Sequence, residues 1–276
     1  FRQGGATPSY TNIIEFVEIA TLGNMTDFGD LTQTVQEPGA AANPTRCLIF
    51  GGYKGAPSYW QDRIEFHEIQ TTGSSTDFGD LTKNKGSMGC NNSSKTSALA
   101  SGGYEGSGVD DYTTNIDKIN MGSLGNATAF GTLAVKSGYN ANASNTVRSI
   151  VAGGGAASPG RTNRIEFCTF QSGGAGTDFG DLTGAKRLAG ACGNRIQGHL
   201  GGGNPGYDAI EKITYATIGN AVDFGDLVSA EESHGATQAN SPTRGLFAGG
   251  GDSPNNSKIE FLTFSSSGGT TDFGDL

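Results

Sequence analysis

Residues 51–81 read GGYKGAPSYWQDRIEFHEIQTTGSSTDFGDL, and this stretch holds three short tags that recur along the whole chain. They are a Gly pair, an Ile-Glu tag and an Asp-Phe-Gly-Asp-Leu (DFGDL) tag. The DFGDL tag stands at 27–31, 77–81, 178–182, 223–227 and 272–276, and a decayed copy, Ala-Phe-Gly-Thr-Leu, stands at 129–133. The steps between copies are 50, 52, 49, 45 and 49 residues. A repeat of this period is typical of propellers and related arrays.

The other two tags precede each DFGDL tag in the same order. The Ile-Glu tags are Ile14-Glu15, Ile64-Glu65, Ile116-Asp117, Ile165-Glu166, Ile210-Glu211 and Ile259-Glu260. The Gly pairs are Gly4-Gly5, Gly51-Gly52, Gly102-Gly103, Gly153-Gly154, Gly202-Gly203 and Gly249-Gly250. We therefore divide the chain into six repeats, approximately 1–31, 32–81, 82–133, 134–182, 183–227 and 228–276, within a single domain of 276 residues.

Each repeat contains enough sequence for four short strands. In the second repeat these are a small-residue stretch (39–45), a strand that ends on the Gly pair (46–50), an alternating strand (64–69) and the DFGDL tag. The alternation places Ile64 and Phe66 on one face of the third strand and Glu65 and His67 on the other. Gly, Ser, Asn and Thr fill the joints, as hairpin turns require.

The sequence thus predicts an all-β, six-bladed β-propeller of the kelch-like kind, with four-stranded antiparallel blades and boundaries near residues 32, 82, 134, 183 and 228. Closing the blades into a ring buries their faces and removes most exposed edges. An open β-solenoid is the alternative fold. Because the first repeat begins at Phe1, three residues before its Gly pair, we expect an incomplete first blade. We also expect that the native polypeptide extends beyond this segment, or that the ring closes imperfectly.

Composition narrows the possible functions. Glycine supplies 46 residues, and 27 acidic against 18 basic residues give a net charge of −9. An acidic chain lacks the basic surface that nucleic acids need, and no apolar run is long enough to cross a membrane. The four cysteines, Cys47, Cys90, Cys168 and Cys192, show no metal-ligand spacing, and we expect free thiols. We predict no metal, no cofactor, no nucleic-acid partner and no membrane insertion.

The repeat resembles one found in a known family. The pattern from the Gly pair through the Ile-Glu tag to Asp-Phe-Gly-Asp-Leu-Thr is similar to the kelch-like repeat of virion structural and tail-fibre-type proteins of marine cyanobacterial phages. The resemblance covers essentially the whole chain and departs at Ala129 and Thr132 of the third repeat. It implies a protein of the phage particle, assembled in the host cytoplasm, with other virion proteins or a host-surface receptor or glycan as partners. It carries over no catalytic residues.

Two interpretations of the DFGDL tag are open. In the first, the aromatic residue packs between blades, and the aspartates cap turns through hydrogen bonds to the backbone. The expected core positions are then Phe28, Phe78, Phe130, Phe179, Phe224 and Phe273. In the second, paired aspartates bind calcium, although the spacing is not that of an EF-hand.

A group of aromatic residues is the candidate binding face. The loops between second and third strands hold Tyr10, Tyr53, Tyr59, Trp60, Tyr104, Tyr112 and Tyr207. In a propeller these loops share one face of the ring, and Tyr and Trp suit sugars and protein partners. The alternative is that they anchor their own loops or cover blade edges.

The residues that usually mark catalysis do not converge in the sequence. His67, His199 and His234 lie at different positions in different repeats, and their spacing shows neither a zinc pair nor a nucleophile–base pair. We therefore expect a non-catalytic structural or host-attachment module that binds protein or glycan. A sugar-binding lectin propeller with one site per blade is the alternative, and a propeller enzyme is the third possibility.

Overall fold

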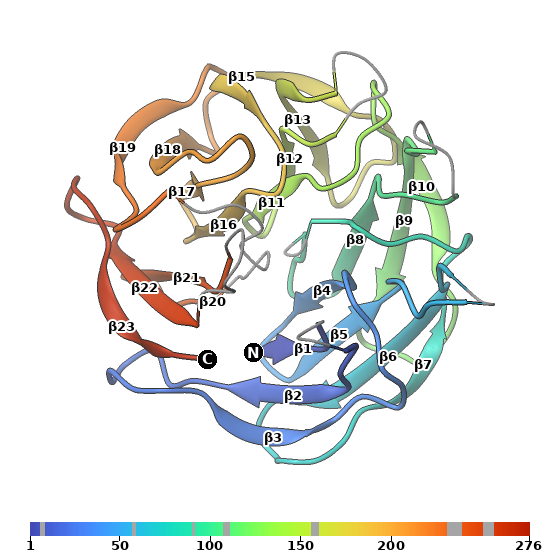
Figure 1. Cartoon of the computed structure of the whole chain (residues 1–276). Coiled ribbons are helices and arrows are strands. Elements are labelled where there is room, and N and C mark those ends of the chain that lie inside the picture. Colours follow the sequence, from blue (N-terminus) through green and yellow to red (C-terminus); the bar gives the residue numbers. More distant parts are fainter. Residues whose placement is uncertain are drawn as a thin grey trace.

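The computed structural model describes residues 1–5, 9–56, 59–89, 92–106, 111–155, 160–230, 239–250 and 257–276. These residues form six small sheets arranged in a ring, and the described part of the chain contains no helix (Figure 1). The prediction of a six-bladed β-propeller is confirmed. In each blade the chain runs from the centre of the ring towards its rim, so the DFGDL tag forms the outermost strand of every sheet except that of blade 3.

The strands coincide with the repeated sequence pattern in every blade: one ends before the Gly pair, the next contains the Ile-Glu tag, and another contains most of the DFGDL tag. Blade 1 contains β1 (Arg2–Gln3), β2 (Ile13–Phe16) and β3 (Thr26–Asp30). Blade 2 contains β4 (Gly39–Ala42), β5 (Arg46–Phe50), β6 (Arg63–Glu68) and β7 (Thr76–Asp80). Blade 3 contains β8 (Ser97–Ser101), β9 (Asn115–Asn120) and β10 (Thr128–Thr132). Blade 4 contains β11 (Ala141–Ser144), β12 (Arg148–Ala152), β13 (Thr162–Thr169) and β15 (Thr177–Lys186). Blade 5 contains β16 (Gly190–Gly193), β17 (Gln197–Gly201), β18 (Ala209–Thr214) and β19 (Val222–Asp226). Blade 6 contains β20 (Ala239–Asn240), β21 (Arg244–Ala248), β22 (Lys258–Thr263) and β23 (Thr271–Asp275).

Two blades depart from the four-strand pattern. Blade 1 has three strands, as expected from the short first repeat. In blade 3 the described residues at the innermost position form one bridge, between Ser93 and Ala98, and residues 90–91 of that segment lie outside the described part of the chain. The fourth strand of that sheet is instead β14 (Gly174–Ala175), which blade 4 contributes and which runs parallel to β10.

The DFGDL tag also joins each blade to the next one. In blade 2 the Phe78 carbonyl accepts a hydrogen bond from the Gly125 N–H of blade 3 at 2.9 Å, and the Asp80 carbonyl accepts one from Ala127 at 2.7 Å. The same contact closes the ring, because the Gly23 N–H of blade 1 donates to the Phe273 carbonyl of blade 6 at 3.1 Å. Both ends of the chain therefore meet in a closed circle of blades (Figure 1).

The core lies in the seams between blades. Phe28, Phe78, Phe179, Phe224 and Phe273 are buried, whereas Phe130 is only partly buried. Apolar residues of the neighbouring blade complete each cluster: Phe78 groups with Ala98, Ile119 and Met121 of blade 3. Because a neighbour covers both faces of a blade, the polar face of the third strand is buried too. Glu65 is 4% exposed and His67 is 3% exposed.

Candidate functional site

The loops between second and third strands form a continuous row of aromatic rings. Ring centroids lie 5.9 Å apart for Tyr10 and Tyr53, 5.1 Å for Tyr53 and Trp60, 5.4 Å for Trp60 and Tyr104, and 5.3 Å for Tyr104 and Tyr112. Tyr59 branches from the row, 6.0 Å from Tyr53. We call these six residues the aromatic ridge. The ridge spans blades 1 to 3 and joins six of the seven aromatic residues predicted from the sequence.

Tyr207 does not belong to this row. Its ring instead lies over the Lys186 ammonium, 5.1 Å from the ring centroid. Tyr139, which precedes the innermost strand of blade 4, extends the ridge at 6.4 Å from Tyr112. Sequence reasoning missed Tyr139 because it considered only the second-to-third loops, and the adjoining segment between blades reaches the same face.

Short backbone bridges set the order of the rings. Tyr53 pairs with Gln36 and Trp60, and Tyr104 pairs with Gly86 and Tyr112. The bridges to Gln36 and Gly86 hold each loop against the segment that leads into its own blade, and the bridges to Trp60 and Tyr112 join the two sides of the loop. Neighbouring rings along the row meet edge to face. In blades 4 and 5 the equivalents of Tyr53 and Tyr104 are Gly155 and Asn204, and among the described residues the row ends at Tyr139.

Part of the ridge has a structural role. A Cβ atom on Gly86 would lie 2.5 Å from the Trp60 ring, and one on Gly138 would lie 2.8 Å from the Tyr112 ring. These two rings therefore pack tightly against the segment that leads into the following blade. Trp60 Nε1 also donates a hydrogen bond to the Gly106 carbonyl at 2.7 Å. Tyr112 is 8% exposed, but Tyr59 is 50% exposed. The ridge thus combines buried wedges with an accessible aromatic edge around Tyr59.

In blades 2 to 6 the acid of the Ile-Glu tag meets the residue that follows the DFGDL tag of the preceding blade. The backbone N–H groups of Thr32, Ala134 and Thr183 donate to Glu65, Glu166 and Glu211 of the next blade at 2.9, 2.8 and 2.6 Å. Thr82 Oγ1 donates to Asp117 at 2.6 Å. Five of the six tag acids are buried, namely Glu65, Asp117, Glu166, Glu211 and Glu260. The Ile-Glu tag is therefore a contact between blades, and these five acids are inaccessible.

A basic residue balances the buried acid from one of two positions. In blades 2 and 4 it directly precedes the tag: Arg63 lies 2.9 Å from Glu65, and Arg164 lies 2.8 Å from Glu166. In blades 3 and 5 it lies in the segment that leads into the blade: Lys85 is 3.3 Å from Asp117, and Lys186 is 2.9 Å from Glu211. Each of these blades uses one position only, because a second cation would be buried without a partner.

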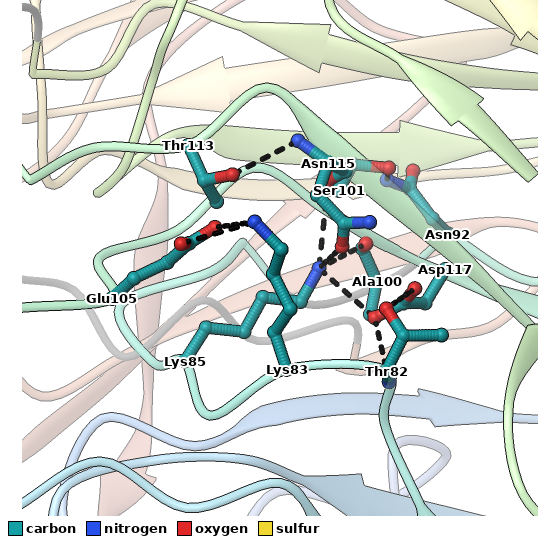
Figure 2. A network of polar contacts seen from close by, with 10 residues as sticks. All are labelled: Thr82, Lys83, Lys85, Asn92, Ala100, Ser101, Glu105, Thr113, Asn115 and Asp117. Carbon is teal, nitrogen blue, oxygen red and sulfur yellow. Dashed lines mark hydrogen bonds and ion pairs between the residues drawn. The ribbon is translucent and has the colours of Figure 1, made fainter. Parts of the chain in front are cut away.

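Lys85 shows how such a buried pair is held (Figure 2). Its ammonium donates to Asn115 Oδ1 at 2.6 Å and to the Ala100 carbonyl at 3.0 Å, and it faces the Asp117 carboxylate. Burial lowers the pKa of Lys85 to about 8, and Asp117 opposes that change. Because both side chains are completely buried, no substrate reaches this amine. The pair is structural.

The histidines and cysteines are likewise core residues. His67 packs against Phe28 and His199 stacks on Phe264, and burial lowers the pKa of both imidazoles to about 4. Burial also raises the pKa of the Cys47 and Cys168 thiols to about 11. Cys47, Cys168 and Cys192 are free and buried. His234 and Cys90 lie outside the described residues. None of the described thiols or imidazoles lies in an accessible reactive setting.

The expectation that the tag aspartates cap turns is wrong. Asp27, Asp30, Asp77 and Asp80 are exposed, and no tag carboxylate in the described part of the chain accepts a hydrogen bond from a backbone N–H. Instead, the backbone of the tag is itself capped by an asparagine side chain of the next blade. Asn126 Oδ1 of blade 3 accepts from the backbone N–H of Asp80 at 3.1 Å, and Asn24 accepts from Asp275 in the same way.

The opposite face of the ring contains a cavity on the axis. It measures about 700 Å³, and the turns between first and second strands of five blades surround it. Its lining includes the second residue of each turn, namely Pro44, Lys95, Thr146, Arg195 and Pro242. These turns lie at the other end of strands such as β5 from the aromatic ridge. The molecule therefore has two distinct faces.

No model of a known protein family matches this sequence, and no curated protein matches it. Among the described residues, no three His, Cys, Asp or Glu side chains gather into a group able to hold a metal ion. The same residues include no helix with the length and apolar character of a membrane span. The closed propeller, with loops on two faces, is consistent with a binding module.

Proposed function

We propose that this chain is a non-catalytic binding module of a phage particle, and that the aromatic ridge receives a glycan or a protein at the host surface. The observation that carries the proposal is the unbroken row of five rings across three blades, with Tyr59 branching from it half exposed. Rigid aromatic side chains supply large contact areas at low entropic cost, and they dominate binding energy at many interfaces.

The arrangement favours one site over one site per blade. Gly155 and Asn204 stand in blades 4 and 5 where blades 2 and 3 have Tyr53 and Tyr104, so the described loops there do not repeat the paired rings of the ridge. A lectin with a site in every blade would need that surface repeated. We therefore propose one ligand per chain, and a stoichiometry near six in a titration would favour the lectin.

The test compares Tyr59→Ala with Leu124→Ala on a glycan array and on host cells. Both side chains are exposed, at 50% and 62%, but Leu124 lies in a third-to-fourth hairpin away from the ridge. We expect Tyr59→Ala to weaken binding by tenfold or more, as truncation of an interface anchor does, and Leu124→Ala to leave it unchanged. Equal binding by both variants would overturn the assignment of the ridge.

The place of the chain in a phage particle rests on the resemblance of its repeat. Mass spectrometry of purified particles tests this separately, since peptides of this chain are expected among the structural proteins. Their absence from particles, with the chain present in the infected cell, would count against it. Catalytic turnover of a ligand would contradict the non-catalytic assignment.

A further inference from the structure

We propose that the axial cavity, on the face opposite the aromatic ridge, binds a small polyol that carries two oxyanion groups such as phosphate or sulfate. The first observation is the charge of its lining. Among the described residues around the cavity, Lys95 and Arg195 are the charged ones, and neither an aspartate nor a glutamate accompanies them. The chain as a whole has a net charge of −9, so this is a local reversal of sign.

The two cations are available for a ligand. Both side chains are exposed, and within the described residues neither makes an ion pair or a hydrogen bond through its charged group. Other basic residues of the same turns behave differently. Arg46 lies 3.0 Å from Glu68, and Arg244 donates to the Ile19 carbonyl at 3.3 Å, so these side chains are used in the seams.

The backbone of both cationic residues is fixed by the preceding blade. Asn43 Nδ2 donates to the Lys95 carbonyl at 3.3 Å, and Asn145 Nδ2 donates to the Arg195 carbonyl at 3.3 Å. Each asparagine also caps its own turn, as Asn145 Oδ1 does by accepting from Val147 and Arg148. The two residues therefore occupy equivalent turn positions with a fixed backbone in blades 3 and 5, on either side of Thr146.

Competing carboxylates lie far from the axis. The aspartates that open each tag are on the outermost strands, three strand spacings or about 14 Å from the innermost ones. Physiological salt screens exposed charges over about 8 Å. The tag aspartates on the outermost strands therefore weaken the positive potential around Lys95 and Arg195 only slightly. A volume of about 700 Å³ falls within the range of small-molecule sites. Two cations on different blades favour a ligand with two anionic groups, and the Thr146 hydroxyl between them can hydrogen-bond a polyol linker.

Calorimetric titration of the whole chain at low salt tests the site. The probes are inorganic pyrophosphate, a disulfated disaccharide and the uncharged parent disaccharide. We expect the charged probes to bind and the uncharged one not to bind. Lys95→Gln and Arg195→Gln should each weaken binding by tenfold or more, because a charge-assisted hydrogen bond is lost.

Lys54→Gln is the matched control, since it removes the same charge from an exposed lysine on the aromatic-ridge face. We expect it to change the affinity by less than twofold, and Tyr59→Ala to leave anion binding intact. Binding of pyrophosphate alone would identify a phosphate ligand, and binding of the disaccharide alone a sulfated sugar. Failure of both charged probes to bind, preference for the uncharged probe, or equal losses in all three charge variants would overturn the proposal.

Discussion

At the scale of single residues, the neutral histidines buried between blades make the stability of the folded protein depend on pH. Among the described residues neither ring nitrogen of His199 has a hydrogen-bond partner, and Phe224 and Phe264 pack against the ring. The pKa of His67 and of His199 is about 4 in the folded protein because burial disfavours the charged form. In the unfolded chain a histidine titrates near 6.5. The unfolded state therefore binds more protons between these two pH values.

We predict that stability falls as the pH drops from about 6.5 to about 4. The loss is up to about 3 kcal/mol for each histidine, since one pKa unit corresponds to about 1.4 kcal/mol. Urea denaturation at pH 7.5 and pH 4.5 measures it. His199→Leu should lose correspondingly less stability over this range than the wild type. Carboxylates contribute equally to both proteins, so an identical loss would show that His199 is not responsible.

The tag phenylalanines differ in burial, and this difference gives a second prediction. Phe78 is 3% exposed inside an apolar cluster, whereas Phe130 is only partly buried. We expect Phe78→Ala to cost about 3–5 kcal/mol of unfolding free energy, as for other buried aromatic rings, and Phe130→Ala to cost less than half of that. Denaturant titrations compare the two. Equal costs would show that seam packing does not follow burial.

At the scale of the structural element, the seam is the unit that the repeat encodes. The carbonyls of a DFGDL strand receive hydrogen bonds from the next blade, and the residue after the tag binds the buried acid there. Close approach of the two backbones explains the glycine of the tag. A Cβ atom on Gly79 would lie 2.5 Å from the carbonyl of Gly125.

We predict that Gly79→Ala destabilises the protein more than Gly125→Ala. Both residues have positive φ, +150° and +147°, so both substitutions strain the backbone. Only the first also pushes blade 3 away, because open space surrounds the Cβ position of Gly125. Thermal unfolding of both variants measures the difference. A larger drop for Gly125→Ala would mean that backbone strain, and not contact across the seam, dominates.

The two positions for the balancing cation should be interchangeable. Lys186→Val leaves Glu211 buried without its partner, and losing one member of a buried pair costs about 3–5 kcal/mol. Adding Ala209→Arg recreates the arrangement of Arg63 and Glu65. We predict that the double variant is more stable than Lys186→Val alone, as measured by urea denaturation. Ala209→Arg in the wild type is the control and should destabilise. No recovery in the double variant would refute the exchange.

At the scale of the whole molecule, the ring closes through a seam with the same phenylalanine packing and backbone hydrogen bonds as the other seams. Phe273 of blade 6 packs against Val17, Ile19 and Met25 of blade 1, and Asn24 caps the backbone of Asp275. These partners are separated by about the full length of the chain. Closure therefore fixes the relative positions of the five turns that surround the axial cavity.

We predict that the closing seam is as strong as an internal one. Phe273→Ala should reduce the unfolding free energy within about 1 kcal/mol of the reduction caused by Phe78→Ala, because both rings are 3% exposed. Denaturant unfolding measures both. A cost below about 1 kcal/mol for Phe273→Ala, with the full cost for Phe78→Ala, would indicate that blades 1 and 6 separate easily.

The sequence by itself determined the blade count, the strand order within a blade and the core role of the tag phenylalanines. These follow from local patterns: tags repeated in one order, alternation with a period of two, and turn residues between strands. It also placed the six residues of the aromatic ridge on one face, because loops at the same end of equivalent strands lie on the same face of the ring.

Only the tertiary structure decided what each polar residue does. Alternation shows which residues share a face, but a neighbouring blade covers both faces, so the pattern could not reveal that Glu65 is buried or that Asp27 is exposed. The pairing of Lys186 with Glu211 and the meeting of Lys95 and Arg195 at one cavity join residues 25 to 100 positions apart. Such contacts depend on the curvature of the closed ring, and no local pattern in the chain specifies it.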